Sequence, residues 1–139
     1  MGGFATDVRV RFAETDAQGI AHHAAYLVWF EVARVAYLEE HAGGYPELRR
    51  RGVEALVLES HVRYLQPARF DDRLIVHARL DGVRGARLRF EYSVRRGDDE
   101  IADGWTAHAC VDASTLRPVH VPSWLTEAVA TASSTSSSS

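Results

Sequence analysis

The chain has 139 residues, of which 46% are hydrophobic and 25% are charged, and its formal net charge is -3. A chain of this length forms one ordinary domain with a single core. Its charge gives no general attraction to nucleic acid, and no apolar run approaches the roughly 20 residues that cross a membrane. The N-terminal stretch MGGFATDVRV lacks the basic and apolar segments of a secretory signal, so we expect a cytoplasmic protein.

A strand and a long helix are predicted first along the chain. Residues 7–12 alternate hydrophobic and charged side chains, the period of a half-buried strand. A helix is predicted over residues 23–41, and Gly43 and Gly44 end it. Its charged residues are Glu31, Arg34, Glu39 and Glu40. Because almost every other position is apolar, we expect this helix to be covered on nearly all sides.

The rest of the chain has the pattern of strands. They are predicted over residues 53–64, 73–80, 86–96 and 101–112. In residues 86–96 hydrophobic side chains alternate perfectly with charged or polar ones. The short connections LDGVRG and RRGDDE favour antiparallel hairpins between the last three strands. About five antiparallel strands and one long helix are therefore expected.

A sheet curled around one helix is an α+β architecture called the hotdog fold. We expect one such domain over residues 1–127. Pairing with a second copy would cover the open edges of the sheet, so we expect a homo-oligomer, either a dimer or a tetramer. Residues 128–139 are rich in serine and are predicted to form a flexible tail.

Asp16 is the first candidate catalytic residue, because it stands seven residues before the predicted helix. The first backbone N–H groups of a helix are unpaired and carry a partial positive charge, so they would polarise a substrate carbonyl near residues 22–24. The flexible Gly19 allows the carboxylate to fold back toward the same carbonyl, an arrangement suited to acyl transfer to water. The alternative is that Asp16 only caps the loop or the helix.

A metal or a bound cofactor has little support in the sequence. His22 and His23 are adjacent and would point about 100° apart on a helix, which is a poor spacing for a shared metal. The remaining candidate ligands are scattered on other elements, namely His108, Cys110 and His120. No Gly-rich phosphate loop and no Gly-x-Ser-x-Gly motif is present. We therefore expect neither a metal nor a cofactor, and no serine hydrolase.

Two groups of arginines are candidates for binding phosphate. Residues 49–51 are three consecutive arginines, which favour a solvated face. Arg84, followed by Arg87 and Arg89, differs because it lies in a tight connection next to Gly85, where a ligand can approach the backbone closely. Arginine binds phosphate through its planar fork of N–H groups, so we retain this second group as a candidate.

Two segments resemble one known family. The first, ETDAQGIAHHAAYLVWFEVAR within residues 12–38, resembles the signature of the 4-hydroxybenzoyl-CoA thioesterase family and its Tol-Pal-associated acyl-CoA thioesterase relatives. The matching positions are Asp16, Gly19, Ile20, His22, His23, Tyr26 and Arg34. The second, HVRYLQPARFDDRL at residues 61–74, resembles the strand, Pro-Ala turn and aspartate of the same family. The likeness extends over most of the chain, up to the segment VDASTLRPVHVP, and the two motifs together favour catalysis over simple capping for Asp16.

The resemblance implies roles for particular residues. Asp16 corresponds to the catalytic carboxylate, acting as nucleophile or as the base for water. His23 corresponds to the residue whose backbone N–H polarises the thioester carbonyl, and its ring would help to position water or substrate. Arg84 and Arg87 correspond to a basic cluster that contacts the phosphates of CoA. The sequence departs from the family pattern at Gln18, Ala25, Gly85 and Ala86. The last two thin the basic cluster.

The resulting prediction is hydrolysis of an acyl-CoA thioester at a site between two subunits. The predicted substrate-binding residues are Gly19, Tyr26, Trp29, Ser60, Arg84 and Arg87. Tyr26 and Trp29 either line an aromatic acyl pocket or pack in the core. Ser60 either faces a partner's site or lies at an exposed strand end. Two alternatives stay open: an acyl-carrier-protein thioesterase, and a non-catalytic module that binds acyl thioesters. A hotdog dehydratase has no support in the sequence.

Overall fold

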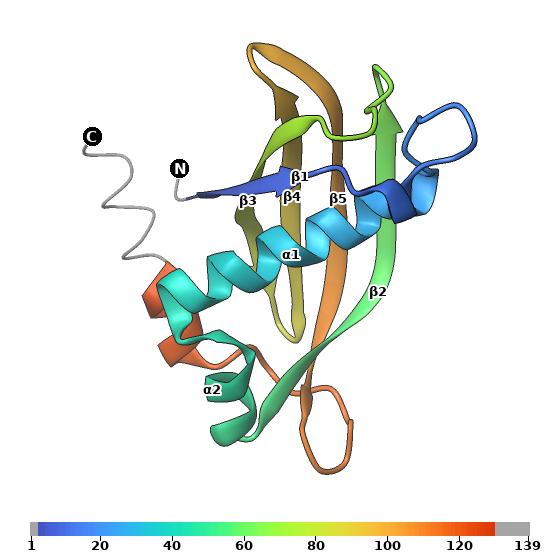
Figure 1. The fold of residues 1–139 in the computed structure, drawn as a ribbon. Coiled ribbons are helices and arrows are strands. Elements are labelled where there is room, and N and C mark those ends of the chain that lie inside the picture. The colour runs from blue at the N-terminus through green and yellow to red at the C-terminus, as the bar shows by residue number, and fades with distance from the viewer. Residues whose placement is uncertain (1–2, 130–139) are drawn as a thin grey trace.

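One antiparallel sheet and one long helix form most of the computed structural model, which describes residues 3–129 (Figure 1). Within these residues the sheet has five strands in the order β1-β3-β4-β5-β2. The strands are β1 (Phe4–Arg9), β2 (Val53–Tyr64), β3 (Arg73–Arg84), β4 (Arg87–Arg96) and β5 (Asp99–Asp112). Helix α1 (His23–Ala42) lies against one face of the sheet. The predicted α+β class and the antiparallel arrangement of β3, β4 and β5 are confirmed.

The alternation of side chains along β4 explains how the helix is held. Leu88, Phe90, Tyr92 and Val94 are buried on the face that meets α1. Phe30 of α1 stacks on Tyr92 with the ring centroids 4.3 Å apart. Full burial of a Leu, Phe or Val side chain contributes about 2 kcal/mol relative to exposure. The ring contacts between α1 and β4 therefore help to hold the helix against this face of the sheet.

Helix α1 begins at the predicted residue, but a second helix follows it that the sequence did not indicate. Gly43 has a φ of 81°, in the left-handed region that ends many helices. The short helix α2 (Gly44–Arg50) begins immediately afterwards. Pro46 lies in its first turn, where a missing N–H is tolerated. Glu47 accepts hydrogen bonds from Arg50 and Arg51 one turn later, which supports this short helix.

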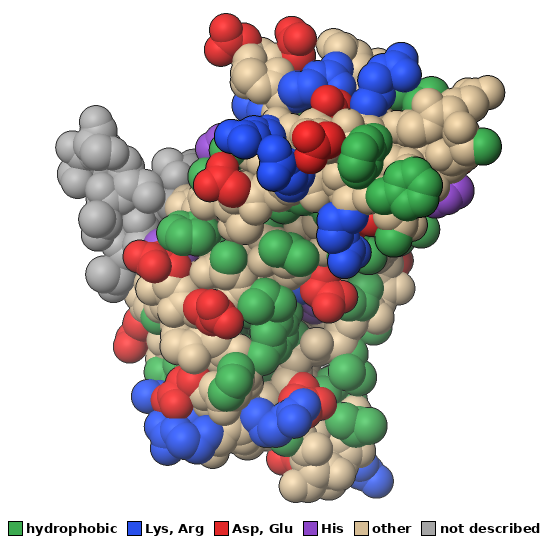
Figure 2. All heavy atoms as spheres, in the orientation of Figure 1, with side chains coloured by type: hydrophobic (Ala, Val, Ile, Leu, Met, Phe, Trp, Pro, Cys, Tyr) green, Lys and Arg blue, Asp and Glu red, His purple; other side chains and the backbone are tan. Residues whose placement is uncertain are grey.

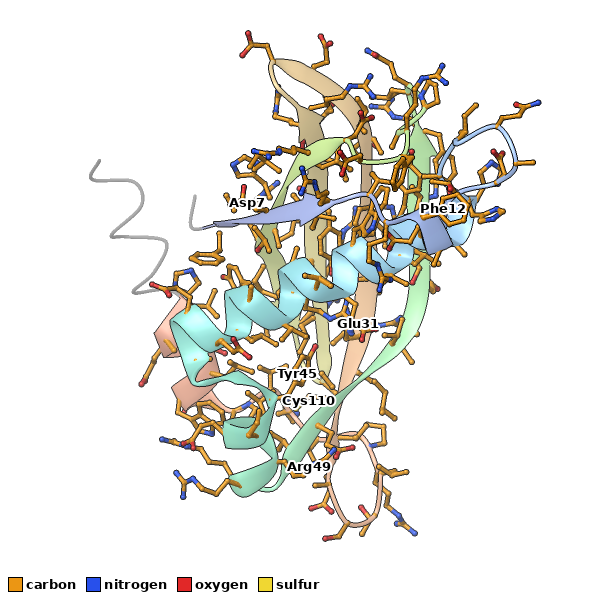
Figure 3. The ribbon with its side chains drawn as sticks, viewed as in Figure 1. Asp7, Phe12, Glu31, Tyr45, Arg49 and Cys110 are labelled. Carbon is orange, nitrogen blue, oxygen red and sulfur yellow. The ribbon has the colours of Figure 1, made fainter. Side chains whose placement is uncertain are left out.

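The bounds predicted for the first strand, residues 7–12, are wrong. Strand β1 starts earlier, at Phe4, and its pairing with β3 ends at Arg9. The chain then turns into the 3-10 helix η1 (Phe12–Glu14), in which Phe12 is 77% exposed. Figure 3 shows Phe12 beside the start of α1. The turn is closed by the Glu14 N–H, which donates to the Arg11 carbonyl. The alternation of hydrophobic and charged residues therefore continues past the point where the strand ends.

The folded part of the chain extends slightly beyond the predicted domain. Residues 123–129 are helical, and Val129 is buried against the core. The first two residues assigned to the tail, 128 and 129, therefore belong to this helical segment. Residues 130–139, the rest of the predicted tail, lie outside the described residues.

Among residues 3–129, one side of α1 is not covered by the rest of the chain. The side facing the sheet is buried, whereas Leu27, Val28 and Val32 on the other side are 40–48% exposed. Leu56, Val57 and Leu58 on the edge strand β2 are also exposed. Figure 2 shows hydrophobic side chains gathered on the face that carries α1, and Figure 3 shows Glu31 on the same side. The single chain therefore covers its helix less completely than the sequence predicted.

Candidate functional site

Asp16 lies on an exposed loop that doubles back on itself. Its Oδ1 accepts hydrogen bonds from the backbone N–H groups of Gln18, at 2.8 Å, and Ile20, at 3.1 Å. Gly19 has a φ of 78°, which glycine adopts without steric cost. The backbone hydrogen bonds from Ile20 and Gln18 lower the pKa of Asp16 below its ordinary value. The carboxylate is thus ionised near neutral pH.

These contacts show that Asp16 caps its own loop and not helix α1. Within residues 3–129, both hydrogen bonds go to Oδ1, and Oδ2 accepts none. One carboxylate oxygen therefore holds the loop, and the other points to no protein donor. Capping and catalysis, which were alternatives at the level of the sequence, are compatible in this geometry.

The start of α1 presents two unpaired backbone donors. His22 is the N-cap residue, and its N–H donates to the Glu14 carbonyl at 2.8 Å. Within residues 3–129, the N–H groups of His23 and Ala24 donate no hydrogen bond. The first turn of α1 contains no acidic side chain. The positive end of the helix dipole is therefore free to stabilise an oxygen anion.

A groove of about 240 Å³ opens beside this helix start. His23 and Tyr26 of α1 form one wall, and residues 64–67 form the other. Ile20 and Ala21, at the end of the Asp16 loop, complete the lining. The structure thus brings three predicted residues, Asp16, Gly19 and His23, to one end of α1, with Tyr26 in the adjoining groove.

Tyr64 is a residue of this groove that sequence reasoning missed. Its hydroxyl donates to the His23 carbonyl at 3.1 Å, and its ring lies 4.8 Å from the His23 ring with an interplanar angle of 31°. The Tyr26 ring meets the Tyr64 ring edge-on, and the Tyr26 hydroxyl accepts a hydrogen bond from the Ala68 N–H. Burial raises the pKa of both tyrosines, so both hydroxyls are neutral. Tyr64 lies in the second family motif, which was the signal available in the sequence.

Trp29 is placed in the core and not in the groove. Its side chain is only 1% exposed, and its indole N–H donates to the Glu14 carboxylate at 3.0 Å. Glu14 is itself 8% exposed, although it stands two residues before the exposed Asp16. Sequence reasoning did not single out Glu14, and no local pattern marks its contact with a residue 15 positions later.

Ser60 lies on the edge strand β2, opposite Thr106 of β5. Directly opposed residues of an antiparallel pair share a face of the sheet, and Thr106 is buried toward α1. Ser60 is therefore exposed on the helix side of the sheet.

Arg84 and Arg87 lie far from Asp16 of the same chain. They flank the turn between β3 and β4, where Arg87 pairs with Ala109 of β5. Tyr64, in the groove, pairs with Ala102 of the same strand. Seven residues separate positions 102 and 109, which is roughly 23 Å along a strand. In Figure 1 this turn is at the end of the sheet near α2, away from the start of α1. One chain alone does not bring these arginines to the groove.

A curved antiparallel sheet packed against one long helix is the architecture of hotdog-fold thioesterases. The chain belongs to the thioesterase-like superfamily, whose family model matches residues 10–129. This membership confirms the resemblance found in the two sequence motifs, the hotdog fold and the assignment as an enzyme of the thioesterase class.

Individual relatives match over most of their length. The chain is 34% identical over 121 residues to the acyl-CoA thioesterase YbgC of Haemophilus influenzae, covering 86% of this chain and 89% of the relative. It is 30% identical over 125 residues to the putative acyl-CoA thioesterase YneP of Bacillus subtilis, covering 86% and 91%. The crystal structure of a hypothetical protein from Thermus thermophilus superposes with a TM-score of 0.85 at 35% identity, covering 91% and 97%.

Among residues 3–129, no three His, Cys, Asp or Glu side chains are grouped so that they could hold a metal ion. The helices of the same region are too short or too polar to cross a membrane.

Proposed function

We propose that the protein hydrolyses an acyl-CoA thioester to a free carboxylic acid and CoA. The observation that best supports this is the position of Asp16, whose loop is joined to the start of α1 by the hydrogen bond between Glu14 and His22. An ionised carboxylate and two unpaired backbone donors are thereby kept at the same end of one helix. The relatives named as acyl-CoA thioesterases support CoA as the thiol carrier.

The chemistry follows from these groups. The thioester carbonyl oxygen accepts hydrogen bonds from the N–H groups of His23 and Ala24, which strengthen as negative charge develops on it. Loss of one such donor typically raises the barrier by about 3 kcal/mol. Asp16 has two roles consistent with its position. It attacks the carbonyl carbon and forms an anhydride that water then hydrolyses, or it accepts a proton from the attacking water. In both cases the CoA thiolate leaves and is protonated.

The proposed site uses two copies of the chain. The uncovered side of α1 is apolar, and the exposed Val57 of β2 lies on the same side of the sheet because it pairs with the buried His108. A second copy would cover this face. Because Arg84 and Arg87 are remote from Asp16 within one chain, we propose that the CoA phosphates are bound by these arginines of the second copy. Ser60 then faces the groove of the partner. The mass of the assembly in light scattering distinguishes a dimer from a tetramer.

The hydrolysis itself is tested by release of free thiol from a panel of aliphatic and aromatic acyl-CoA substrates. Asp16→Asn keeps an oxygen acceptor for the loop but removes the negative charge, so turnover should fall by about 10³-fold with the fold intact. His23→Ala keeps the backbone donor and should cost much less. Near-normal turnover by Asp16→Asn would refute the assignment. Binding of acyl-CoA without release by the wild type would indicate a non-catalytic module.

The two-copy site is tested by mixing inactive variants. Asp16→Asn and the double variant Arg84→Ala/Arg87→Ala are each expected to be impaired, the second through a raised KM. A mixed dimer contains one site with both defects and one site with neither, so a refolded or co-expressed mixture should regain activity. Light scattering gives the mass of the assembly. Failure to regain activity in a demonstrably mixed dimer would contradict the shared site.

An acyl-carrier-protein substrate is the second candidate. It is favoured by the thinned basic cluster, since Gly85 and Ala86 separate Arg84 from Arg87 in an exposed turn. Turnover of matched acyl-CoA and acyl-carrier-protein substrates distinguishes the two. The cytoplasmic location predicted from the N-terminal sequence stays a prediction, and fractionation of cells that express the protein tests it.

A further inference from the structure

Glu14 is the charged side chain next to the site that the proposed mechanism does not use. Burying a carboxylate is costly unless it is paired and hydrogen-bonded. Its Oε1 accepts from the Arg11 backbone N–H at 2.9 Å. Its Oε2 accepts from the Trp29 indole at 3.0 Å and from the Arg11 guanidinium at 3.3 Å. Burial raises the pKa of Glu14, but the hydrogen bonds from Arg11 and Trp29 outweigh this and leave the pKa below its ordinary value.

The backbone of Glu14 connects this buried carboxylate to both parts of the site. Its carbonyl accepts the N–H of His22, the residue that precedes the two free donors of α1. Thr15 and Ala21 pair next to this bond, and the Asp16 N–H then donates to the Ile20 carbonyl. The loop that carries Asp16 is therefore closed by successive backbone contacts, and Glu14 is at their base.

Trp29 provides the fixed end of this connection. It lies on α1 six residues after His23, is almost fully buried, and packs against Tyr26 with the ring centroids 4.6 Å apart. The Arg11 guanidinium is 70% exposed and is a weaker contributor, because solvent screens its charge. The hydrogen bond from the buried indole is the contact that ties Glu14 to the rigid core.

We propose that Glu14, held by the indole of Trp29, is a positioning residue that fixes the Asp16 loop against the start of α1. This inference rests on the proposed role of Asp16 in hydrolysis. It also gives Trp29 a function different from the substrate contact predicted from the sequence. A carboxylate displaced by about 1 Å from its reacting position can lose about 100-fold in rate, so such an anchor is expected to affect turnover directly.

Three variants and a matched control test the anchor. Glu14→Gln removes the charge and one acceptor at nearly constant size, and Trp29→Phe removes only the indole portion that donates. Each should lower kcat for acyl-CoA by about 10- to 100-fold while KM stays within about twofold. Because both changes weaken the contact between Glu14 and Trp29, the loss in the double variant should be smaller than the product of the two single losses. Glu47→Gln removes a hydrogen-bonded carboxylate on α2 and should leave kcat unchanged.

A second measurement is independent of activity. In the wild type, the amides of Ile20 and His22 should be protected from hydrogen exchange, and both should exchange faster in Glu14→Gln and Trp29→Phe than in Glu47→Gln. All rates are measured well below the lowest melting temperature, so that unfolded protein does not contribute. If Glu14→Gln does not fold, Trp29→Phe carries both measurements.

The outcomes separate this inference from the proposed function. Wild-type protein without thioesterase activity refutes the proposed function, and the exchange data then still decide whether the anchor exists. Active wild type with unchanged kcat and unchanged exchange in Glu14→Gln and Trp29→Phe overturns the anchor alone. A raised KM or an altered acyl preference in Trp29→Phe, with kcat unchanged, also overturns it, because Trp29 would then be a wall of the acyl site.

Discussion

Acidification is expected to destabilise the fold through one buried histidine. His108 is fully buried on β5, and its Nε2 lies 2.7 Å from the Thr106 hydroxyl. Arg34 donates to the Tyr92 hydroxyl, which lies 2.7 Å from the same Thr106 oxygen. A guanidinium can only donate, so the chain of hydrogen bonds is completed when Thr106 donates to Nε2 of a neutral imidazole. Burial and then the positive charge of Arg34 lower the pKa of His108 from 6.5 to about 4.

The size and direction of the effect follow from this shift. Between pH 6.5 and pH 4 the unfolded chain binds a proton at His108 that the folded protein does not bind. The free energy of unfolding is therefore unaffected by His108 above about pH 6.5 and falls as the pH approaches 4. The difference between 6.5 and about 4 corresponds to a loss of about 3 kcal/mol. This is a large part of the about 5–15 kcal/mol that stabilises a typical domain.

The assay is urea unfolding at a series of pH values and at one fixed protein concentration, because assembly also contributes to stability. His108→Gln retains an oxygen that can accept the Thr106 hydrogen bond but does not titrate. The wild type should lose about 3 kcal/mol more than this variant between pH 7 and pH 4. Equal losses in the two proteins would refute the assignment of a buried neutral imidazole.

This prediction also separates stability from catalysis. The pKa of Asp16 is lowered from 3.8, so most of its carboxylate is ionised above pH 4, over the range in which His108 weakens the fold. Loss of activity on acidification from pH 6.5 toward 4 should therefore follow unfolding measured by circular dichroism. Activity that falls while the protein stays fully folded would indicate a different titrating group in the reaction.

Three more variants and one control variant test the surroundings of the site. Tyr64→Phe removes the hydroxyl that donates to the His23 carbonyl, and kcat measured by thiol release should fall by about 3- to 10-fold. The melting temperature measured by thermal unfolding should change by no more than a few degrees. Val28→Arg places a charge on the uncovered face of α1, so the mass in light scattering should shift toward the monomer and activity should be lost. Glu40→Arg, at the exposed end of the helix, is the control and should change neither. Ala68→Leu adds bulk at a fully buried position and should destabilise the protein by about 1–3 kcal/mol in urea unfolding.

The parts of the fold that were predictable are those with a strong local pattern. Strand β4 was found to within one residue because its side chains alternate between core and solvent over its whole length. Helix α2 was not found, because Gly43, Gly44 and Pro46 are ordinarily breakers of a helix. Here Gly43, between the helices, and Gly44, the first residue of α2, have positive φ angles of 81° and 83°, and Pro46 fits the first turn of α2.

The coverage of α1 shows a different limit of the sequence. An apolar helix predicts burial but does not say which chain supplies the covering surface. Val28 and Val32 are as hydrophobic as the residues that face the sheet, yet they are exposed in the single chain. Likewise the hydrogen bond between Glu14 and Trp29 and that between Tyr64 and His23 join residues 15 and 41 positions apart. Such contacts depend on how whole elements pack together, so the periodicity of hydrophobic residues along the sequence does not predict them.

The two family motifs occur together because they form one physical unit. The Ala68 carbonyl in the Pro-Ala turn accepts the Ala21 N–H at 2.8 Å, and the Phe70 N–H donates to the Gly19 carbonyl at 2.8 Å. The Ala68 N–H donates to the Tyr26 hydroxyl. The second motif thus holds the far side of the Asp16 loop, while Glu14 holds its base. A loop exposed to solvent would otherwise be free to move, so the position of its carboxylate depends on both attachments at once.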